Sequence, residues 1–482
     1  MNFKSILRIL GILITLLSLT LIPPMIVAFI YRDSGGLPLI ESFFITLALG
    51  GSLWYRFRKS KRELKTRDGF LIVVLFWSVL SLFGSLPFLL STQLDVSLVD
   101  AVFESFSGLT TTGATVLTGL DEMPKAILYY RQQLQWIGGM GIIVLAVAVL
   151  PMLGIGGMQL YKAEAPGPVK DSKLTPRIAG TAKALWYIYL ALTISCTLAY
   201  WAAGMELFDA ITHAYSTVAI GGFSTHDASM AYFDSAAIEI ICSAFMLIAG
   251  INFSLHYLAF NNVAIGHYFK DPEFRTYVTL LFIAITICFL ALWSYDTYSA
   301  DTSLRHAIFQ AISVGTTAGF TTVNFNLWPA FLPILLIFTS FVGGCAGSTG
   351  GGMKVIRFLL LFKQGFREVK KLIHPHAVFM IKLGKQPIDN KIVEAVWGFF
   401  AAYVFIFVTM LLILMADGLD QVTAFSAVAA CLNNLGPGLG EVALNYASIG
   451  DLSKWVLCLA MLLGRLEIFT LLVLVMPAFW RR

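Results

Sequence analysis

The sequence predicts an all-α polytopic membrane protein, because its composition is apolar, its apolar blocks have the length of membrane spans, and one short segment occurs four times. Hydrophobic residues make up 58% of the 482 residues and charged residues 13%, and the mean hydropathy is +0.79. Soluble globular domains carry roughly 25% charged residues. About ten blocks reach or approach the roughly 20 apolar residues that cross the hydrocarbon core. These blocks are Ile9–Ile30, Leu37–Trp54, Phe70–Leu90, Leu134–Leu153, Trp186–Trp201, Ile238–Phe260, Val278–Trp293, Ile334–Phe362, Val393–Met415 and Trp455–Phe479.

The placement of basic residues predicts how the chain is oriented. Most Lys and Arg residues fall in alternate connecting segments, and the segments between these are nearly neutral. Basic residues accumulate in cytoplasmic loops, so the basic segments and both termini are expected in the cytoplasm. This orientation accounts for the net charge of +5 without a nucleic-acid partner. The first block has no small-residue cleavage site after it, which favours a retained helix over a signal peptide. The basic segments are 4–8, 56–67, 162–183, 270–275, 354–391 and 481–482.

Four short segments between pairs of blocks align without gaps, and an internal repeat of this kind defines the organisation of a chain. Each begins with alanine and ends with glycine, and the first three share a serine at the seventh position. Each also follows one apolar block and precedes another. The four segments are Ala101–Gly113, Ala210–Gly222, Ala307–Gly319 and Ala424–Gly436.

The repeat divides the chain into two N-terminal helices and four units of helix, half-helix, non-helical loop and helix. We expect the two extra transmembrane helices and a basic cytoplasmic loop in residues 1–68. The four units are expected at 69–160, 184–265, 276–365 and 391–482, the third of them interrupted at 343–353.

Each repeated segment is expected to form a half-helix of about nine residues, starting at the shared alanine and ending where glycine lets the chain turn. Non-helical backbone at membrane depth is tolerated only where it packs in protein or lines a watery cavity. Four such stretches around one axis can replace the water shell of a cation with carbonyl oxygens. The C-terminal ends of the half-helices also favour a cation. Loops that only pack are the alternative, although packing does not require the shared glycine.

Polar residues at the fourth position of the first three segments are expected to support the loops from behind. They are Glu104, His213 and Gln310, and Ala427 departs from the pattern.

A glycine-rich run interrupts the second helix of the third unit. Six glycines lie between Phe341 and Lys354, and each costs a helix roughly 1 kcal/mol relative to alanine. The run is therefore expected to form a loop just below the half-helix ends. It is similar to a nucleotide-binding P-loop, but Met353 and Val355 flank Lys354, so the required Gly-Lys-Ser/Thr is absent. A kink that only relieves crowding between helices is the alternative.

Arg465 lies in the middle of the last apolar block, where an arginine costs roughly 2.5–3.5 kcal/mol to insert. Glu467 is too near in sequence to face Arg465 on one side of a helix. Arg465 therefore has either a role in the site or a carboxylate partner elsewhere in the bundle.

Four motifs carry a resemblance to the Trk/Ktr/HKT superfamily of potassium transporters, closest to its bacterial TrkH/TrkG subunits, over the whole chain. The TVGYG signature of tetrameric potassium channels is absent, as is usual in this superfamily. The motifs are TTTGA at Thr110–Ala114, AIGGFST at Ala219–Thr225, TTAGFTT at Thr316–Thr322 and NNLGPG at Asn433–Gly438.

The resemblance implies a selectivity filter in which backbone carbonyls bind K⁺. Members with serine at the first filter glycine tend to favour sodium, so Gly113 implies potassium preference, and a filter with one glycine per repeat implies that Rb⁺ passes as well. The implied ligands are the carbonyls of Thr111, Thr112, Gly113, Ile220, Gly221, Gly222, Thr317, Ala318, Gly319, Asn434, Leu435 and Gly436.

The resemblance also implies that the glycine-rich run is an intramembrane gate that blocks permeation. Arg465 is then a positive barrier in the path beside this gate. The implied gate residues are Gly343, Gly344, Gly347, Ser348, Thr349, Gly350, Gly351, Gly352 and Lys354.

The function that these features imply is gated, channel-like potassium uptake across the bacterial inner membrane. Because no nucleotide-binding domain is found in the sequence, the membrane potential, about 2.3 kcal/mol per charge per 100 mV, is the expected driving force. The resemblance implies a homodimer and a cytosolic TrkA-type nucleotide-binding ring, for which residues 354–391 are the candidate contact. A secondary symporter that couples K⁺ to H⁺ or Na⁺ is the alternative.

An enzyme is not expected, since no metal-ligand set or nucleophile–base pair occurs within the apolar blocks. The six cysteines are scattered without a CxxC motif, which disfavours a zinc site or a disulfide framework. K⁺ is the expected cargo, with no organic cofactor on this chain.

Overall fold

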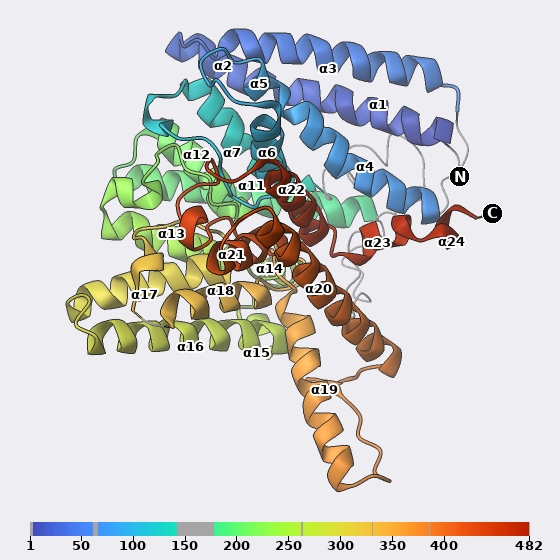
Figure 1. The fold of residues 1–482 in the computed structure, drawn as a ribbon, viewed down its shortest axis with the longest axis vertical. Helices are drawn as coiled ribbons and strands as arrows, with labels where there is room; N and C mark the ends of the chain where they lie inside the picture. Colours follow the sequence, from blue (N-terminus) through green and yellow to red (C-terminus); the bar gives the residue numbers. More distant parts are fainter. Residues whose placement is uncertain are drawn as a thin grey trace.

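The computed structural model describes residues 3–60, 66–141, 178–261, 264–329, 331–384 and 386–481, and these form a helical bundle (Figure 1). The α-helices are α1 (Phe3–Thr20), α2 (Ile22–Tyr31), α3 (Gly36–Phe57), α4 (Thr66–Gly84), α5 (Leu86–Leu89), α6 (Leu98–Leu109), α7 (Lys125–Gly139), α11 (Ile178–Ala202), α12 (Leu207–Ala219), α13 (Ala236–Ala249), α14 (Phe253–Asn261), α15 (Gly266–Lys270), α16 (Pro272–Ser294), α17 (Ala300–Gly315), α18 (Leu332–Val342), α19 (Val355–Ile373), α20 (Asn390–Ala416), α21 (Gln421–Leu432), α22 (Asp451–Arg465), α23 (Phe469–Val475) and α24 (Pro477–Trp480). Short 3₁₀ helices are η1 (Leu120–Glu122), η3 (Ser229–Phe233), η4 (Phe325–Leu327) and η5 (Gly440–Val442). Strands β1 (Lys382–Leu383) and β2 (Gln386–Pro387) form one antiparallel pair.

Among the described residues, six helices are long and apolar enough to cross a membrane, and two bent helix pairs raise the number of spans to as many as eight. The predicted all-α polytopic membrane fold is therefore confirmed. The expected block Leu134–Leu153 lies largely outside the described residues. The block Ile334–Phe362 is divided between α18 and α19, because the glycine-rich run separates them.

The N-terminal helices α1 and α3 pack closely because of two glycines. A Cβ on Gly11 would lie 2.6 Å from the backbone nitrogen of Trp54, and a Cβ on Gly50 would lie 2.6 Å from that of Thr15. Small residues allow such close approach of helices in membranes. These helices therefore form a tight pair ahead of the repeated units.

The four half-helices are α6, α12, α17 and α21. They are 12, 13, 16 and 12 residues long, so the predicted length of about nine is wrong. The helices begin upstream of the shared alanine, and two of them start at capping side chains: Ser97 accepts from the N–H of Asp100, and Asp420 accepts from those of Val422 and Thr423. The shared alanine is instead a packing residue, fully buried in all four half-helices.

Three later helices are broken at corresponding places in the last three units. The sequence predicts continuous spans over Ile238–Phe260 and Trp455–Phe479, but α13 and α14 meet at 92° and α22 and α23 at 115°. The first bend follows from tertiary contacts, since the Gly250 carbonyl accepts from the N–H of Cys345 at 2.9 Å and Phe253 donates to the Gly347 carbonyl at 3.0 Å. In the third unit, the glycine-rich run itself is the break, between α18 and α19.

Helix α19 and the strand pair after it extend away from the bundle (Figure 1). Lys363 donates to the carbonyl of Lys382 at 2.7 Å, and Arg367 donates to the side chain of Asn390 at 2.7 Å. These contacts fold the segment back along α19 and leave a projecting basic element.

Candidate functional site

All four half-helices end in the same hydrogen-bonded turn, the Schellman motif, which satisfies the last carbonyls of a helix. In each turn, one backbone N–H donates to the carbonyl three residues before it, and the next N–H donates to the carbonyl five residues before it. The first set of bonds is Thr111–Gly108 (3.0 Å), Ile220–Thr217 (3.1 Å), Thr317–Val314 (3.0 Å) and Asn434–Cys431 (3.3 Å). The second set is Thr112–Ser107 (2.9 Å), Gly221–Ser216 (2.8 Å), Ala318–Ser313 (2.8 Å) and Leu435–Ala430 (2.7 Å).

Each turn contains two residues with positive φ, separated by one residue. The first is not glycine, and in three of the four repeats it is a β-branched residue, for which this conformation is a genuine outlier. Each such residue costs about 1–3 kcal/mol and persists only when its surroundings enforce it. The residues are Thr111 (φ 55°), Ile220 (53°), Thr317 (69°) and Asn434 (53°), followed by Gly113 (83°), Gly222 (79°), Gly319 (82°) and Gly436 (98°).

The four turns form a closed ring. A Cβ placed on any of the four glycines would lie within 3 Å of the carbonyl oxygen of the residue before the next glycine in the ring. The order is Gly113 to Gly221, Gly222 to Ala318, Gly319 to Leu435, and Gly436 back to Thr112. Because the last repeat returns to the first, the four segments surround one axis, and glycine is required at each contact.

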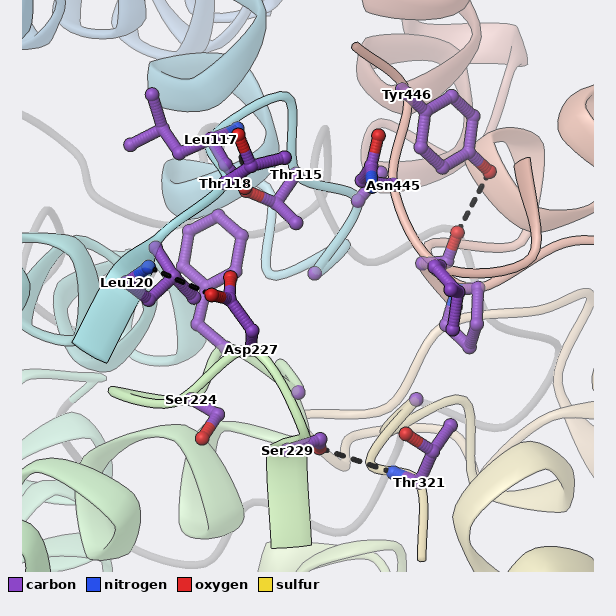
Figure 2. A pocket seen from close by; sticks show the side chains of 18 of the residues that line it. Thr115, Leu117, Thr118, Leu120, Ser224, Asp227, Ser229, Thr321, Asn445 and Tyr446 are labelled. Atoms are coloured by element: carbon purple, nitrogen blue, oxygen red, sulfur yellow. Dashed lines mark hydrogen bonds between the residues drawn. The ribbon is translucent and has the colours of Figure 1, made fainter. Parts of the chain in front are cut away.

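One cavity of about 290 Å³ is lined by all four of these glycines. Figure 2 shows that its side chains come from four parts of the chain, with Thr115 and Leu120, Ser224 and Asp227, Thr321, and Tyr446 on separate segments. Hydrogen bonds across the cavity wall hold these segments: Leu120 donates its N–H to Asp227 at 3.1 Å, and Thr321 donates to Ser229 at 3.2 Å.

A half-buried histidine bridges two acidic residues at the edge of this cavity. His226 lies 2.5 Å from Asp121 and 3.5 Å from Asp209, and its ring stacks on Tyr232. Burial lowers the pKa of His226, but the hydrogen bonds with Asp209 and Asp121 outweigh this and raise it above its ordinary value. The bridge joins the loop after the first repeat to the second half-helix.

The polar residues at the fourth repeat position support the non-helical segments that follow the four turns, as the sequence predicts. Glu104 accepts from the N–H of Val116 at 3.0 Å, His213 contacts the Ser224 hydroxyl at 2.9 Å, and Gln310 donates to the Val323 carbonyl at 3.2 Å. In the fourth repeat, where Ala427 departs from the pattern, the neighbouring Ser426 accepts from the N–H of Leu439 at 2.8 Å.

Two supporting residues on α7 escape the sequence analysis. Arg131 is fully buried, pairs with Glu104 at 2.7 Å and donates to the Ser224 carbonyl at 3.0 Å, so it joins the first two repeats. Gln135 donates to the Gly221 carbonyl at 2.6 Å and accepts from the N–H of Phe223 at 3.1 Å. A buried Arg in a membrane protein is a signal of function. The partners that tie Arg131 and Gln135 to the second repeat lie 86 to 93 residues away, so the sequence does not identify them.

The glycine-rich run packs directly on the half-helix ends. Gly352 donates to the Asn433 carbonyl at 3.0 Å, and Gly351 donates to the Thr317 hydroxyl at 2.6 Å. Thr349 donates to the Val218 carbonyl at 3.0 Å. The run therefore touches the ends of the second, third and fourth half-helices.

Other predicted gate residues lie within or behind this loop. Ser348 donates to the Cys345 carbonyl at 2.7 Å, and Lys354 donates to the Gly350 carbonyl. Gly347 has positive φ and is exposed beside Asn252. Gly343 has positive φ, and Gly344 is buried at the start of the loop.

Arg465 lies beside the loop. Its guanidinium donates to the Thr349 carbonyl at 3.1 Å and to the Gly138 carbonyl at 2.8 Å, and it lies 5.3 Å from the centre of the Trp77 ring. The structure therefore brings Arg465 and the glycine-rich loop together beside the four turns.

The two ends of the loop are held by carboxylates that the sequence analysis did not select. Glu273 accepts from the N–H of Ala346 at 2.7 Å and from that of Ile356 at 3.1 Å. Glu467 pairs with Arg357 at 2.5 Å, and the Arg357 guanidinium lies 4.4 Å from the centre of the Phe399 ring. In the described part of the chain, no group of three or more His, Cys, Asp or Glu side chains is arranged to hold a metal ion.

Residues 38–482 match the protein family described as "TrkH: Cation transport protein". The chain is 60% identical to the "Trk system potassium uptake protein TrkH" of Vibrio parahaemolyticus and 57% identical to that of Escherichia coli, over the full length of both chains in each case. It is 42% identical to the "Trk system potassium uptake protein TrkG" of Escherichia coli, over 98% of this chain and 97% of the relative. The crystal structure of the potassium transporter TrkH from Vibrio parahaemolyticus superposes with a TM-score of 0.91 at 58% identity, covering all of both chains.

The Arg131–Glu104 pair yields a stability prediction. Arg131→Met leaves a buried carboxylate without its partner, which costs roughly 3–5 kcal/mol, and should lower the melting temperature in detergent. The double variant Arg131→Met with Glu104→Gln removes both charges and should recover much of the loss. A double variant that melts no higher than Arg131→Met would contradict the pairing energy as the cause.

Proposed function

The chain belongs to the TrkH family of cation transport proteins and is a multi-pass membrane transporter for potassium uptake rather than an enzyme, and from that premise we propose that it is a gated, channel-like path for K⁺ across the bacterial inner membrane. Under this proposal, K⁺ passes along the axis that the four glycine turns surround, and Rb⁺ passes as well. The closed ring of turns is the observation that carries the proposal.

The proposed ion ligands are main-chain carbonyls of the four turns. The half-helices end at the ring, and their C-terminal ends carry a nominal charge of about −0.5 each, which favours a cation there. Fixed carbonyls replace the hydration shell of a potassium ion. A carbonyl oxygen has two lone pairs, so Gly221, which accepts from Gln135, and Gly436, which accepts from Tyr446, keep one for an ion. The proposed set is Thr111, Thr112, Gly113, Ile220, Gly221, Gly222, Thr317, Ala318, Gly319, Asn434, Leu435 and Gly436.

The proposed gate is residues 343–354, with Arg465 as a positive barrier beside it. The support is that the loop packs against the half-helix ends and that the Arg465 guanidinium donates to the loop carbonyl of Thr349. Two unit charges 4 Å apart repel by up to about 4 kcal/mol at an effective dielectric constant near 20, so an arginine in the path discourages a cation strongly.

The proposed driving force is the membrane potential, about 2.3 kcal/mol per charge per 100 mV. The proposed orientation places both termini and the projecting α19 in the cytoplasm, because their flanks are basic. The proposed assembly is a homodimer regulated by a cytosolic TrkA-type nucleotide-binding ring that contacts residues 354–391.

The ring of glycines is tested with a matched pair of substitutions. Gly319→Ala should reduce Rb⁺ uptake into proteoliposomes by at least roughly tenfold, because the added Cβ meets the Leu435 carbonyl. Gly119→Ala is the control, since Gly119 has a similar φ of 73° with nothing near its Cβ, and its uptake should stay near that of the parent chain. Equal uptake by both variants would contradict a ring of ion ligands. Current that requires a proton or sodium gradient would instead favour a symporter.

The barrier role of Arg465 is tested by charge. Arg465→Ala should increase K⁺ flux at least severalfold, because a positive charge leaves the path. Arg465→Lys retains the charge and should have a flux near that of the parent chain. Unchanged or lower flux for Arg465→Ala, with a normal size-exclusion profile, would refute the barrier.

The contact with the cytosolic ring is tested by charge reversal on α19. Lys370→Glu combined with Lys371→Glu should weaken pull-down of the ring at least roughly tenfold at low salt, because like charges at an interface repel. The control is Arg56→Glu with Arg58→Glu, at the end of α3. If the cytosolic ring stays bound to the α19 variant but dissociates from the α3 variant, its contact lies elsewhere on the protein.

A further inference from the structure

A second cavity, of about 320 Å³, lies behind the gate loop, between α16, α18 and the start of α19. Gly343 and Val355, which stand at the two ends of the loop, both line it. Gly315, the last residue of the third half-helix, lines it as well. This cavity therefore contacts both ends of the loop and the C-terminal end of the third half-helix.

The walls of the cavity suit an apolar guest. Its two polar side chains already have acceptors: Tyr277 donates to the Leu247 carbonyl at 3.2 Å, and Thr339 donates to the Leu336 carbonyl at 2.6 Å. The remaining lining residues are hydrophobic or glycine. A buried water needs two to four polar partners, and this cavity does not offer them to it. Its volume lies at the lower end of the roughly 300–1,000 Å³ of small-molecule sites.

The cavity is continuous with the surface that faces the bilayer. Helix α16 is a candidate membrane span. Ile283 on α16 is 48% exposed and Phe338 on α18 is 54% exposed, and both of these hydrophobic residues line the cavity. The exposed side of a membrane span contacts lipid hydrocarbon. The medium available to this cavity is therefore the acyl region of the membrane.

We propose that an acyl chain of a bilayer phospholipid occupies this cavity and stabilises the closed gate loop. The acyl chain would pack against Val342 and Val355, on either side of the loop. A ligand that binds one arrangement better than another shifts the equilibrium toward the arrangement it binds. An acyl chain that fills the space behind both loop ends therefore favours the closed loop. This regulation rests on the proposed gate, whereas occupancy of the cavity does not.

Occupancy is tested with a phospholipid that carries a photoactivatable diazirine in one acyl chain, reconstituted with the full-length protein. Leu281 and Val355 are buried and line the cavity, so label on them, mapped by mass spectrometry, reports entry of the chain. Ala284→Leu, which fills the cavity, should reduce this label at least fivefold. Ala401→Leu, on the exposed side of α20, should leave the label unchanged.

Three results would overturn occupancy by lipid. These are the absence of label on Leu281 and Val355, label that persists in Ala284→Leu, and cross-links that join these residues to a second copy of the chain. If Ala284→Leu does not give folded protein, Ile287→Phe fills the same cavity from a partly exposed position.

Regulation is tested by K⁺ flux in two bilayers that differ only in acyl shape. Methyl-branched chains fit the cavity poorly, so flux of the parent chain and of Ala401→Leu should be about threefold higher in branched than in straight-chain phospholipid. Flux of Ala284→Leu should be the same in both. Label without a difference in flux for the parent chain would overturn the effect on the loop. Failure of the gate proposal itself would appear separately, as unchanged flux in Arg465→Ala with normal label.

Discussion

The fold depends on one turn made four times at the end of a buried half-helix. In each turn, two consecutive N–H groups bond back into the helix, for example those of Thr111 and Thr112. A trans peptide points its carbonyl opposite to its N–H, so the carbonyls of the same peptides point away from the helix. The four turns pack in cyclic order around a shared axis, along which the proposed ion path runs. The chain can hold this strained backbone at membrane depth because the turns support one another.

Polar side chains of the half-helices hold the ring in place. Each half-helix is hydrogen-bonded to the non-helical segment that follows its own turn, through Glu104, His213, Gln310 or Ser426. Arg131 then joins the first repeat to the second, at a position where both partners are fully or nearly buried. A carbonyl ring selects among cations by the number and position of its oxygens. The geometry of the ring therefore depends on polar contacts between each repeated segment and the residues that follow it, and on Arg131 from outside the segments.

Local sequence predicts the existence of the repeated elements better than their extent. The four glycines, the half-helices, the polar fourth position and the interruption at 343–353 all follow from composition and spacing, because each is a local conformational demand. Half-helix length does not, since the starts depend on caps such as Ser97 and Asp420 outside the aligned segments. The bend between α13 and α14 is also hidden, because it depends on contacts with a loop about ninety residues away. The identification of Arg131 and Gln135 as supports requires knowledge of which helices meet.

The glycine-rich loop packs against the last residues of the half-helices, directly before the turns. The Asn433 carbonyl, at the end of the fourth half-helix, accepts from the N–H of Gly352. A Cβ on Gly351 would collide with this same oxygen, and one on Gly350 would lie 2.9 Å from the Thr316 carbonyl. The run therefore needs glycine for close approach to the half-helix ends as well as for freedom of the backbone. Asn433 and Thr316 directly precede the proposed ion ligands of the fourth and third turns, so the loop packs against the residues next to the proposed filter.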